Sequence, residues 1–350
     1  MSKSLNDVEW KLFSINNIID NINIAKSSDF GKLKEGQTVF IGRQETNNGI
    51  QGFVDSNYNE NANCITISMV ATKMMSFWQS WDFATSQNIL ILRNCNFNKY
   101  NAKFICSILN KYILTKYDYG KPVKLGTFPK EKIMLPINSK GEPDYKFMEE
   151  YIKEREAKLK NQYKEQVLKR VKQLQAKING NGKWGEFRIK DIFPTLVVGK
   201  SKGLNHLEQV EQGGIAYLGA TNRNNGVLCF VEKVGNEKLI QKGNCVAFIR
   251  NGEGSMGYSV YKAENFIATS DITLGYNNKI DKYSGMFITT IADRVRGKYS
   301  FNYKRSDTRL KKEILSLPVD SKGEPDYKFM EDYMKYLEQK KLLEYLDYIK

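Results

Sequence analysis

The sequence predicts an α+β protein made of two copies of one domain, each followed by a long helix. The first observation is a near-repeat: residues 135–153 read LPINSKGEPDYKFMEEYIK and residues 317–335 read LPVDSKGEPDYKFMEDYMK. The second is a series of shorter matches in the same order along the chain. The third is a Gly- and Pro-free amphipathic stretch after the Pro-Asp of each near-repeat. Together they predict two pseudo-symmetric domains separated by two long helices packed as a coiled coil.

The shorter matches extend the repeat over most of the chain. Their offset drifts only from 174 to 184 residues, as insertions in loops would produce. A period of this length is far too long for a solenoid and indicates a duplicated domain. The matched pairs are Trp10 with Trp184, residues 38–54 with 215–231, 83–92 with 267–276, and 130–136 with 311–318.

Each copy mixes strand and helix signals. The runs TVFIG and IAYLG are β-rich, NNG follows both as a turn signal, and GIQGFV or GVLCFV returns as a second strand. NILILR and NCVAFIR predict further strands. KYNAKFICSILNKYILTKY and KYSGMFITTIADRVRGKY place apolar residues near helical spacing. Each copy is therefore predicted to be an α+β domain.

A long helix is predicted after each copy. From Asp144 to Ile178 apolar residues recur mainly every three or four positions among Lys, Glu, Arg and Gln. This narrow apolar stripe, here called the seam, is typical of a helix that pairs with another helix. A helix this polar is not stable alone, so the two helices are expected to pack together. The seam residues are Ile152, Leu159, Val167, Val171 and Leu174 in the first helix and Leu337 and Leu346 in the second.

The domain limits follow from these elements. We predict one domain over residues 1–143, a central spacer helix over 144–180, a second domain over 181–325 and a C-terminal spacer helix over 326–350. At ~1.5 Å per residue the central helix spans roughly 50 Å, or about 15 base pairs of B-DNA at ~3.4 Å each. Two basic domains joined by such a helix could each read one short stretch of a single duplex.

Charge and composition indicate the class of partner. The net charge is +15, which suits a polyanion such as nucleic acid, although solvated lysines alone would give the same composition. The chain has no run of eighteen apolar residues and no apolar signal core at its N-terminus. Its five cysteines form no CxxC pair, which favours reduced thiols in the cytoplasm.

The order of domain, helix, domain and helix resembles the specificity (S) subunit of type I restriction–modification systems, or the similar subunit of type IIB-like systems. The resemblance covers essentially the whole chain. It includes the local sequences WGEFRIKDIF, AYLGATNRNNGV and VAFIRNGEGSMGY, the last of which is followed by FIATSDITL. The first copy departs from the family pattern, because TISMVATKMMSFWQSWD at residues 66–82 replaces the Gly-rich loop.

This resemblance implies two target-recognition domains and a non-catalytic reader of double-stranded DNA. It implies a bipartite, asymmetric site made of two short half-sites and a fixed spacer. It also implies recruitment of DNA adenine methyltransferase (M) subunits, which use S-adenosylmethionine, and in some complexes of a restriction and translocase (R) subunit. The chain itself is expected to hold no cofactor and no metal.

Three polar patches in each copy are candidate DNA contacts, although turns are polar in any protein. In the first copy they comprise Arg43, Gln44, Asn47 and Asn48 of the hairpin turn, Lys73, Gln79 and Ser86 of the central loop, and Lys121 and Lys124 before the near-repeat. In the second copy they comprise Thr221, Asn222, Arg223 and Asn224, then Arg250, Asn251, Ser255 and Ser270, then Lys304, Arg305 and Arg309. Trp78 and Trp81 are expected in the core rather than as wedges in a DNA groove.

Two other functions remain open at this point. Pro143-Asp144 with Glu156-Ala-Lys158, and the equivalent Pro325-Asp326 with Glu338-Gln-Lys340, resemble a PD…ExK nuclease motif. Both ExK triplets are expected on helices, which would place Asp144 and Glu156 about 18 Å apart at ~1.5 Å per residue, too far to share one Mg²⁺ ion. The other alternative is a duplicated coiled-coil adaptor that binds only protein.

Overall fold

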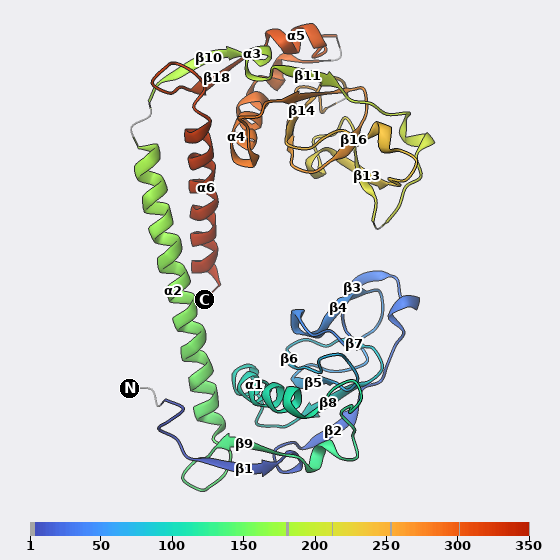
Figure 1. The fold of residues 1–350 in the computed structure, drawn as a ribbon, viewed down its shortest axis with the longest axis vertical. Coiled ribbons are helices and arrows are strands. Elements are labelled where there is room, and N and C mark those ends of the chain that lie inside the picture. Colours follow the sequence, from blue (N-terminus) through green and yellow to red (C-terminus); the bar gives the residue numbers. More distant parts are fainter. Residues whose placement is uncertain (1–3, 180–181, 212, 253, 301, 350) are drawn as a thin grey trace. The chain divides into compact units, whose positions relative to one another are not determined.

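The computed structural model describes residues 4–179, 182–211, 213–252, 254–300 and 302–349. The chain divides into two compact units, Met1–Asn161 and Gln162–Lys350 (Figure 1). The domain limits predicted above stay predictions, and the limit at residues 180 and 181 lies outside the described residues. None of the described helices combines the length and apolar character that a membrane span requires.

Over its described residues, unit 1 contains three sheets and helix α1 (Lys99–Lys116). The first sheet pairs β1 (Trp10–Ser14) with β9 (Lys132–Pro136). The second has the strand order β2 (Asn21–Ile24), β8 (Ile89–Arg93), β5 (Cys64–Ser68) and β6 (Ser76–Gln79). The third has the order β4 (Ile50–Val54), β3 (Glu35–Ile41) and β7 (Ala84–Thr85).

Unit 2 repeats this arrangement strand for strand, with α4 (Lys282–Ala292) in the place of α1. Its two-stranded sheet pairs β10 (Trp184–Arg188) with β18 (Ile314–Pro318). The next sheet has the order β11 (Thr195–Val198), β17 (Ile272–Tyr276), β14 (Cys245–Ile249) and β15 (Ser259–Lys262). The last has the order β13 (Val227–Val231), β12 (Ile215–Leu218) and β16 (Phe266–Ala268). The short helices α3 (Ile189–Ile192) and α5 (Asp307–Lys312) complete the unit.

Pairing registers also repeat between the units. Trp10 lies opposite Pro136, and Trp184 lies opposite Pro318. The hairpins β3–β4 and β12–β13 are antiparallel, and in each unit a strand from the Ala-Thr-Ser phrase adds in parallel. The predicted α+β fold with two repeated domains is confirmed.

The near-repeat forms the same turn and helix start in both units. In unit 1, Asn138 Oδ1 accepts hydrogen bonds from the backbone N–H groups of Lys140 and Glu142. Gly141 has a φ of 76°, in the left-handed region that favours glycine. Asp144 Oδ1 then accepts from the Phe147 N–H at 2.9 Å and acts as an N-cap. The equivalent positions in unit 2 are Asp320, Gly323 and Asp326.

The first turns of both long helices, α2 (Tyr145–Ile178) and α6 (Tyr327–Tyr348), are buried in the preceding domain. Met148 and Met330 are 0% exposed, each in the core of its own unit. Fully burying a methionine side chain is worth about 1.5–3 kcal/mol. An edge-to-face aromatic contact repeats at 5.7 Å in both units, between Phe104 and Tyr151 and between Phe287 and Tyr333. Each helix therefore starts as a packed part of its own domain.

Within unit 2, the last part of α2 runs antiparallel to α6 (Figure 1). Lys164 forms an ion pair with Asp347, and Lys177 Nζ lies 4.0 Å from Asp332 Oδ2. A later residue of α2 therefore pairs with an earlier residue of α6, as the antiparallel arrangement requires. The Lys164–Asp347 pair is exposed and contributes little, whereas Asp332 is a buried carboxylate on α6.

The seam differs from its prediction in three places. Ile152 packs against the core of unit 1 rather than against the second helix, because the start of α2 lies on its own domain. Leu159 and Leu337 are 66% and 37% exposed, so neither forms part of a buried contact. Among the remaining seam residues, Val167 and Leu346 are buried, and Val171 and Leu174 are half-buried.

Charges placed in the buried part of the seam are expected to destabilise unit 2. Val167→Asp or Leu346→Asp puts an unpaired carboxylate where 1% or 7% of the side chain is exposed, at a cost of roughly 3 kcal/mol. Urea unfolding of the purified chain measures this loss. The matched control is Leu159→Asp on the same helix, expected to change stability by less than about 0.5 kcal/mol. Equal unfolding midpoints for all three variants would contradict the helix pairing.

Candidate nucleic-acid interface

The tips of the two predicted hairpins have the same backbone conformation. Asn47 and Asn48 have φ values of 52° and 55°, and Asn224 and Asn225 have values of 48° and 52°. Asparagine adopts this left-handed region more readily than most residues, and a glycine completes the turn in both units. The Asn-Asn-Gly triplet is therefore required by the backbone, which leaves the preceding residues free to differ between the domains.

Those preceding residues present polar side chains to solvent. Arg43 and Gln44 are exposed at the tip in unit 1, as are Asn222 and Arg223 in unit 2, whereas Thr221 is half-buried. Among the described residues, no hydrogen bond or ion pair occupies the guanidinium groups of Arg43 and Arg223. Such groups are suited to a guanine edge or a phosphate.

Asn48 and Gln79 hold the first tip against β6. Asn48 Nδ2 donates to the Trp78 carbonyl at 3.0 Å, and Gln79 Nε2 donates to the Asn48 carbonyl at 3.1 Å. Gln79 is 3% exposed and also donates to Thr66 Oγ1. Its predicted DNA contact is therefore corrected to a structural role. In unit 2, Lys262 Nζ donates to the Asn225 carbonyl at 3.4 Å and fixes the equivalent tip.

The central loops are more internally bonded than expected. Arg250 donates to the Ser270 carbonyl, and Asn251 Nδ2 donates to Asp271 Oδ1 at 3.1 Å. Ser255 is only 6% exposed, so its predicted DNA contact is wrong. In unit 1, Lys73 is exposed and its backbone N–H donates to Glu45 Oε1 at 3.0 Å, which connects the central loop to the hairpin. Of the two remaining serines, Ser86 is half-buried and Ser270 is exposed.

The loops before the near-repeats carry exposed cations, with one exception. Lys121, Lys124, Lys304 and Arg309 are exposed, and the Arg309 guanidinium lies 3.8 Å from the ring centroid of Tyr303. Arg305 is 0% exposed and forms a buried ion pair with Glu313 at 2.5 Å. The prediction that Arg305 contacts DNA is wrong, because its guanidinium is enclosed by the protein.

Two of the candidate patches in unit 2 meet at one cavity of about 650 Å³. Asn251 of the central loop and Lys304 of the loop before the near-repeat both line it. Sequence reasoning did not single out Arg296, Tyr258 and Tyr299 in its wall, although the basic run RVRGK after α4 was a signal. The Arg296 guanidinium lies 4.7 Å from the centroid of the Tyr258 ring. Cationic and aromatic walls of this kind suit a sugar–phosphate chain and its bases.

The two tryptophans of the first central loop lie in different environments. Trp78 is 6% exposed and belongs to the core of unit 1, as expected. Trp81 is 68% exposed, so the prediction that it packs in the core is wrong. Trp81 is therefore an exposed aromatic side chain in the central loop of unit 1.

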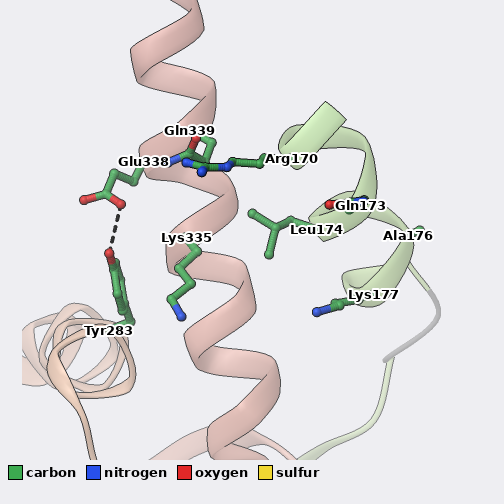
Figure 2. A pocket seen from close by; sticks show the side chains of 9 residues that line it. All are labelled: Arg170, Gln173, Leu174, Ala176, Lys177, Tyr283, Lys335, Glu338 and Gln339. Atoms are coloured by element: carbon green, nitrogen blue, oxygen red, sulfur yellow. Dashed lines mark hydrogen bonds between the residues drawn. The ribbon is translucent and has the colours of Figure 1, made fainter. Parts of the chain in front are cut away.

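The PD…ExK pattern is explained by helix structure. The Asp of each pattern is the N-cap described above, and both ExK triplets lie within helices. Glu156 pairs with Lys103 of α1 at 2.5 Å, and Glu338 accepts a hydrogen bond from Tyr283 of α4 at 3.0 Å (Figure 2). These carboxylates bind their own domain to its spacer helix. Among the residues that the structure describes, no three His, Cys, Asp or Glu side chains are placed to hold a metal ion.

Comparison with known proteins assigns the chain to a family. The family model for the type I restriction modification DNA specificity domain matches residues 7–167 and again residues 181–346. The chain belongs to this family. The resemblance to S subunits is thereby confirmed, and the chain is a DNA specificity subunit of a restriction–modification system. Specificity subunits of this family are non-catalytic.

Individual relatives span nearly the whole chain. The type II restriction enzyme BgcI specificity subunit S.BcgI of Heyndrickxia coagulans is 26% identical over 347 residues, 96% of each chain. The crystal structure of a type I restriction–modification system S subunit from M. genitalium is 14% identical, with a TM-score of 0.39 over 99% of this chain and 95% of that chain. The HsdS subunit from Thermoanaerobacter tengcongensis is 10% identical, with a TM-score of 0.34 over 97% and 91%.

Nearby arginines in the second basic loop should behave differently. Arg305→Ala leaves Glu313 buried without its cation and is expected to lower the free energy of unfolding by roughly 3–5 kcal/mol. Arg309→Ala, at an exposed position, should cost less than about 1 kcal/mol in stability. It should weaken DNA binding and reduce the salt slope, which is the slope of log affinity for DNA against log salt concentration, by about one. Denaturant unfolding and a salt titration of DNA affinity measure these effects. The distinction between the two arginines fails if Arg309→Ala is the more destabilising, or if it leaves the salt slope unchanged.

Proposed function

We propose that this specificity subunit reads a bipartite, asymmetric site in double-stranded DNA, one half-site through each domain. In this proposal the chain performs no catalysis and holds no cofactor. It recruits adenine methyltransferase subunits, which bind S-adenosylmethionine, and in complexes that also restrict DNA it recruits an R subunit. The complex is assigned to the cytoplasm, in agreement with five free cysteines.

The observation that carries this proposal is the contrast between repeated scaffold and different loops. Strand order, hairpin turn and helix start are the same in both units. The residues presented at equivalent loop positions differ, with Arg43 and Gln44 at one hairpin tip and Asn222 and Arg223 at the other. Two versions of one reader with different contact residues suit two different half-sites.

A groove between the paired helices is the surface we propose for a partner subunit. The cavity of about 750 Å³ is lined by Arg170 and Leu174 of α2, Lys335 and Gln339 of α6 and Tyr283 of α4 (Figure 2). Lys335 is already paired with Glu331, whereas Arg170 is exposed and forms no ion pair among the described residues. A partner helix that presents an acidic side chain to Arg170 and an apolar side chain to Leu174 would fit this groove.

The alternative functions have weaker support. A nuclease would need its carboxylates free for a metal, and both ExK glutamates are bonded to their own domains. An adaptor that binds only protein would not need exposed, unpaired arginines at both hairpin tips.

Methylome sequencing of a host that carries the chain and its partner subunits tests the proposal. The wild-type chain should give two different half-sites with a fixed spacer. Four residues inserted after Lys160 lengthen α2 by about 6 Å at ~1.5 Å per residue, close to two base pairs. This position separates the residues that pack on unit 1 from those that pair with α6. The expected result is a changed spacer with unchanged half-sites.

A length-matched control isolates the effect of helix length. Replacing residues 158–161 by four alanines keeps α2 at its original length and should keep the original spacer. An insertion that alters a half-site while the old spacer is retained would show that recognition and spacing are not separate. A wild-type chain that directs no methylation with its partners, or directs it to a single contiguous site, would overturn the proposed function.

A further inference from the structure

Each domain contains a glutamate, directly before its last strand, that binds a tyrosine and a cation. In unit 1, Glu131 precedes β9 and accepts hydrogen bonds from Tyr112, from Lys116 and from Tyr117 at 3.2 Å. The Lys116 ammonium, as the largest cause, lowers the pKa of the Glu131 carboxyl from its usual range. Glu131 is therefore ionised at neutral pH.

Unit 2 contains the same interaction with a different cation. Glu313 precedes β18 and accepts a hydrogen bond from the Tyr299 hydroxyl at 2.6 Å. It also accepts from Arg305 Nε at 3.0 Å and Arg305 Nη2 at 2.5 Å. The side chains of Arg305 and Glu313 are 0% and 3% exposed, whereas those of Lys116 and Glu131 are 36% and 21% exposed.

The tyrosine and the glutamate occupy equivalent positions in the two copies, fourteen residues apart in each. The cation does not, because Lys116 ends α1 and Arg305 comes from the loop itself. The equivalent carboxylates of the two domains therefore pair with cations from different positions. What both solutions share is that they close the loop between the tyrosine and the glutamate. Its described residues are 118–130 in unit 1 and 300 and 302–312, including α5, in unit 2.

These closed loops carry the exposed cations Lys121 and Lys124 in one domain and Lys304 and Arg309 in the other. Each loop is also attached to the central loop of its domain. In unit 1 the Val123 N–H donates to the Met69 carbonyl at 3.1 Å, and Val123 is 1% exposed. In unit 2 Arg305, at the equivalent position, donates from Nη1 to the Gly257 carbonyl at 3.0 Å and the Tyr258 carbonyl at 3.2 Å.

We propose that Glu131 and Glu313 are positioning residues that fix the basic loop of their own domain in its DNA-reading conformation, so that each carboxylate sets the affinity for one half-site. This inference rests on the proposed function. Glu313 has the larger effect, because Arg305, the cation that it binds among the described residues, also holds the central loop. Glu131 has the smaller effect, because Val123 attaches its loop through apolar burial and a backbone bond that do not involve the carboxylate.

Affinity measured against scrambled half-sites tests this assignment. The chain in complex with its methyltransferase partner is titrated with DNA carrying the full site, or with either half-site scrambled. In the wild-type complex each scrambling weakens binding. Glu313→Gln should weaken binding to the full site by roughly tenfold to a hundredfold. It should also remove most of the penalty, which is the loss of affinity caused by scrambling, for one of the two half-sites and leave the penalty for the other unchanged. Glu131→Gln should act on the other half-site, by roughly threefold to tenfold.

Matched variants control for charge and for folding. Glu142→Gln and Glu324→Gln make the same charge change at exposed positions of the near-repeats and should leave both penalties unchanged. Arg223→Ala, at the hairpin tip of unit 2, should reduce the same half-site penalty as Glu313→Gln. If either Gln variant loses cooperative thermal melting, Tyr117→Phe and Tyr299→Phe remove one hydrogen bond each and should give the same half-site pattern with a smaller change.

Three results would overturn the inference. One is an equal loss of affinity for all three DNAs, which a general loss of folded protein would produce. Another is that Glu131→Gln and Glu313→Gln act on the same half-site. The third is a wild-type complex that does not distinguish either scrambled DNA, which would overturn the proposed function itself.

Discussion

Burial of the first helical turns in the preceding domain is the interaction on which the rest of the structure depends. Most residues of α2 are charged or polar, so the helix requires tertiary contacts along its length. Met148 supplies one at its start, Asp144 caps its free N–H groups, and Val167 supplies another where it pairs with α6. The near-repeat forms the turn, the N-cap and the buried first helical turns that make this connection, which is why the two copies agree so closely there.

Away from that connection, each domain separates residues that shape the backbone from residues that face solvent. Asn-Asn-Gly shapes the hairpin tip in both units, while the side chains before it differ. The carboxylates of Glu131 and Glu313 are kept, while the cations that bind them come from different positions. A scaffold of this kind can change the DNA sequence that it reads without changing its fold.

The duplication, the hairpins and the long helices could be predicted because repeated text and periodic apolar residues are local signals. The Gly- and Pro-free stretch from Asp144 to Ile178 became the helix Tyr145–Ile178. The environments of single side chains could not be predicted in the same way. Arg305 lies in a polar stretch of sequence that is typical of a surface loop. Its burial comes from groups elsewhere in the chain, among them Glu313, the Gly257 carbonyl and the Phe248 ring. Periodicity showed that Ile152 is on an apolar stripe, but not that its own domain covers that stripe.

The DNA motif read by a chain with two copies of the second domain tests the central claim most directly. Residues 1–143 would be replaced by residues 181–325, with the junction inside the text shared by both near-repeats and α2 left unchanged. If the domains are autonomous readers joined by a spacer helix, methylome sequencing should show the second half-site at both ends with the wild-type spacer. Two different half-sites, or a folded chain that directs no specific methylation, would contradict the account.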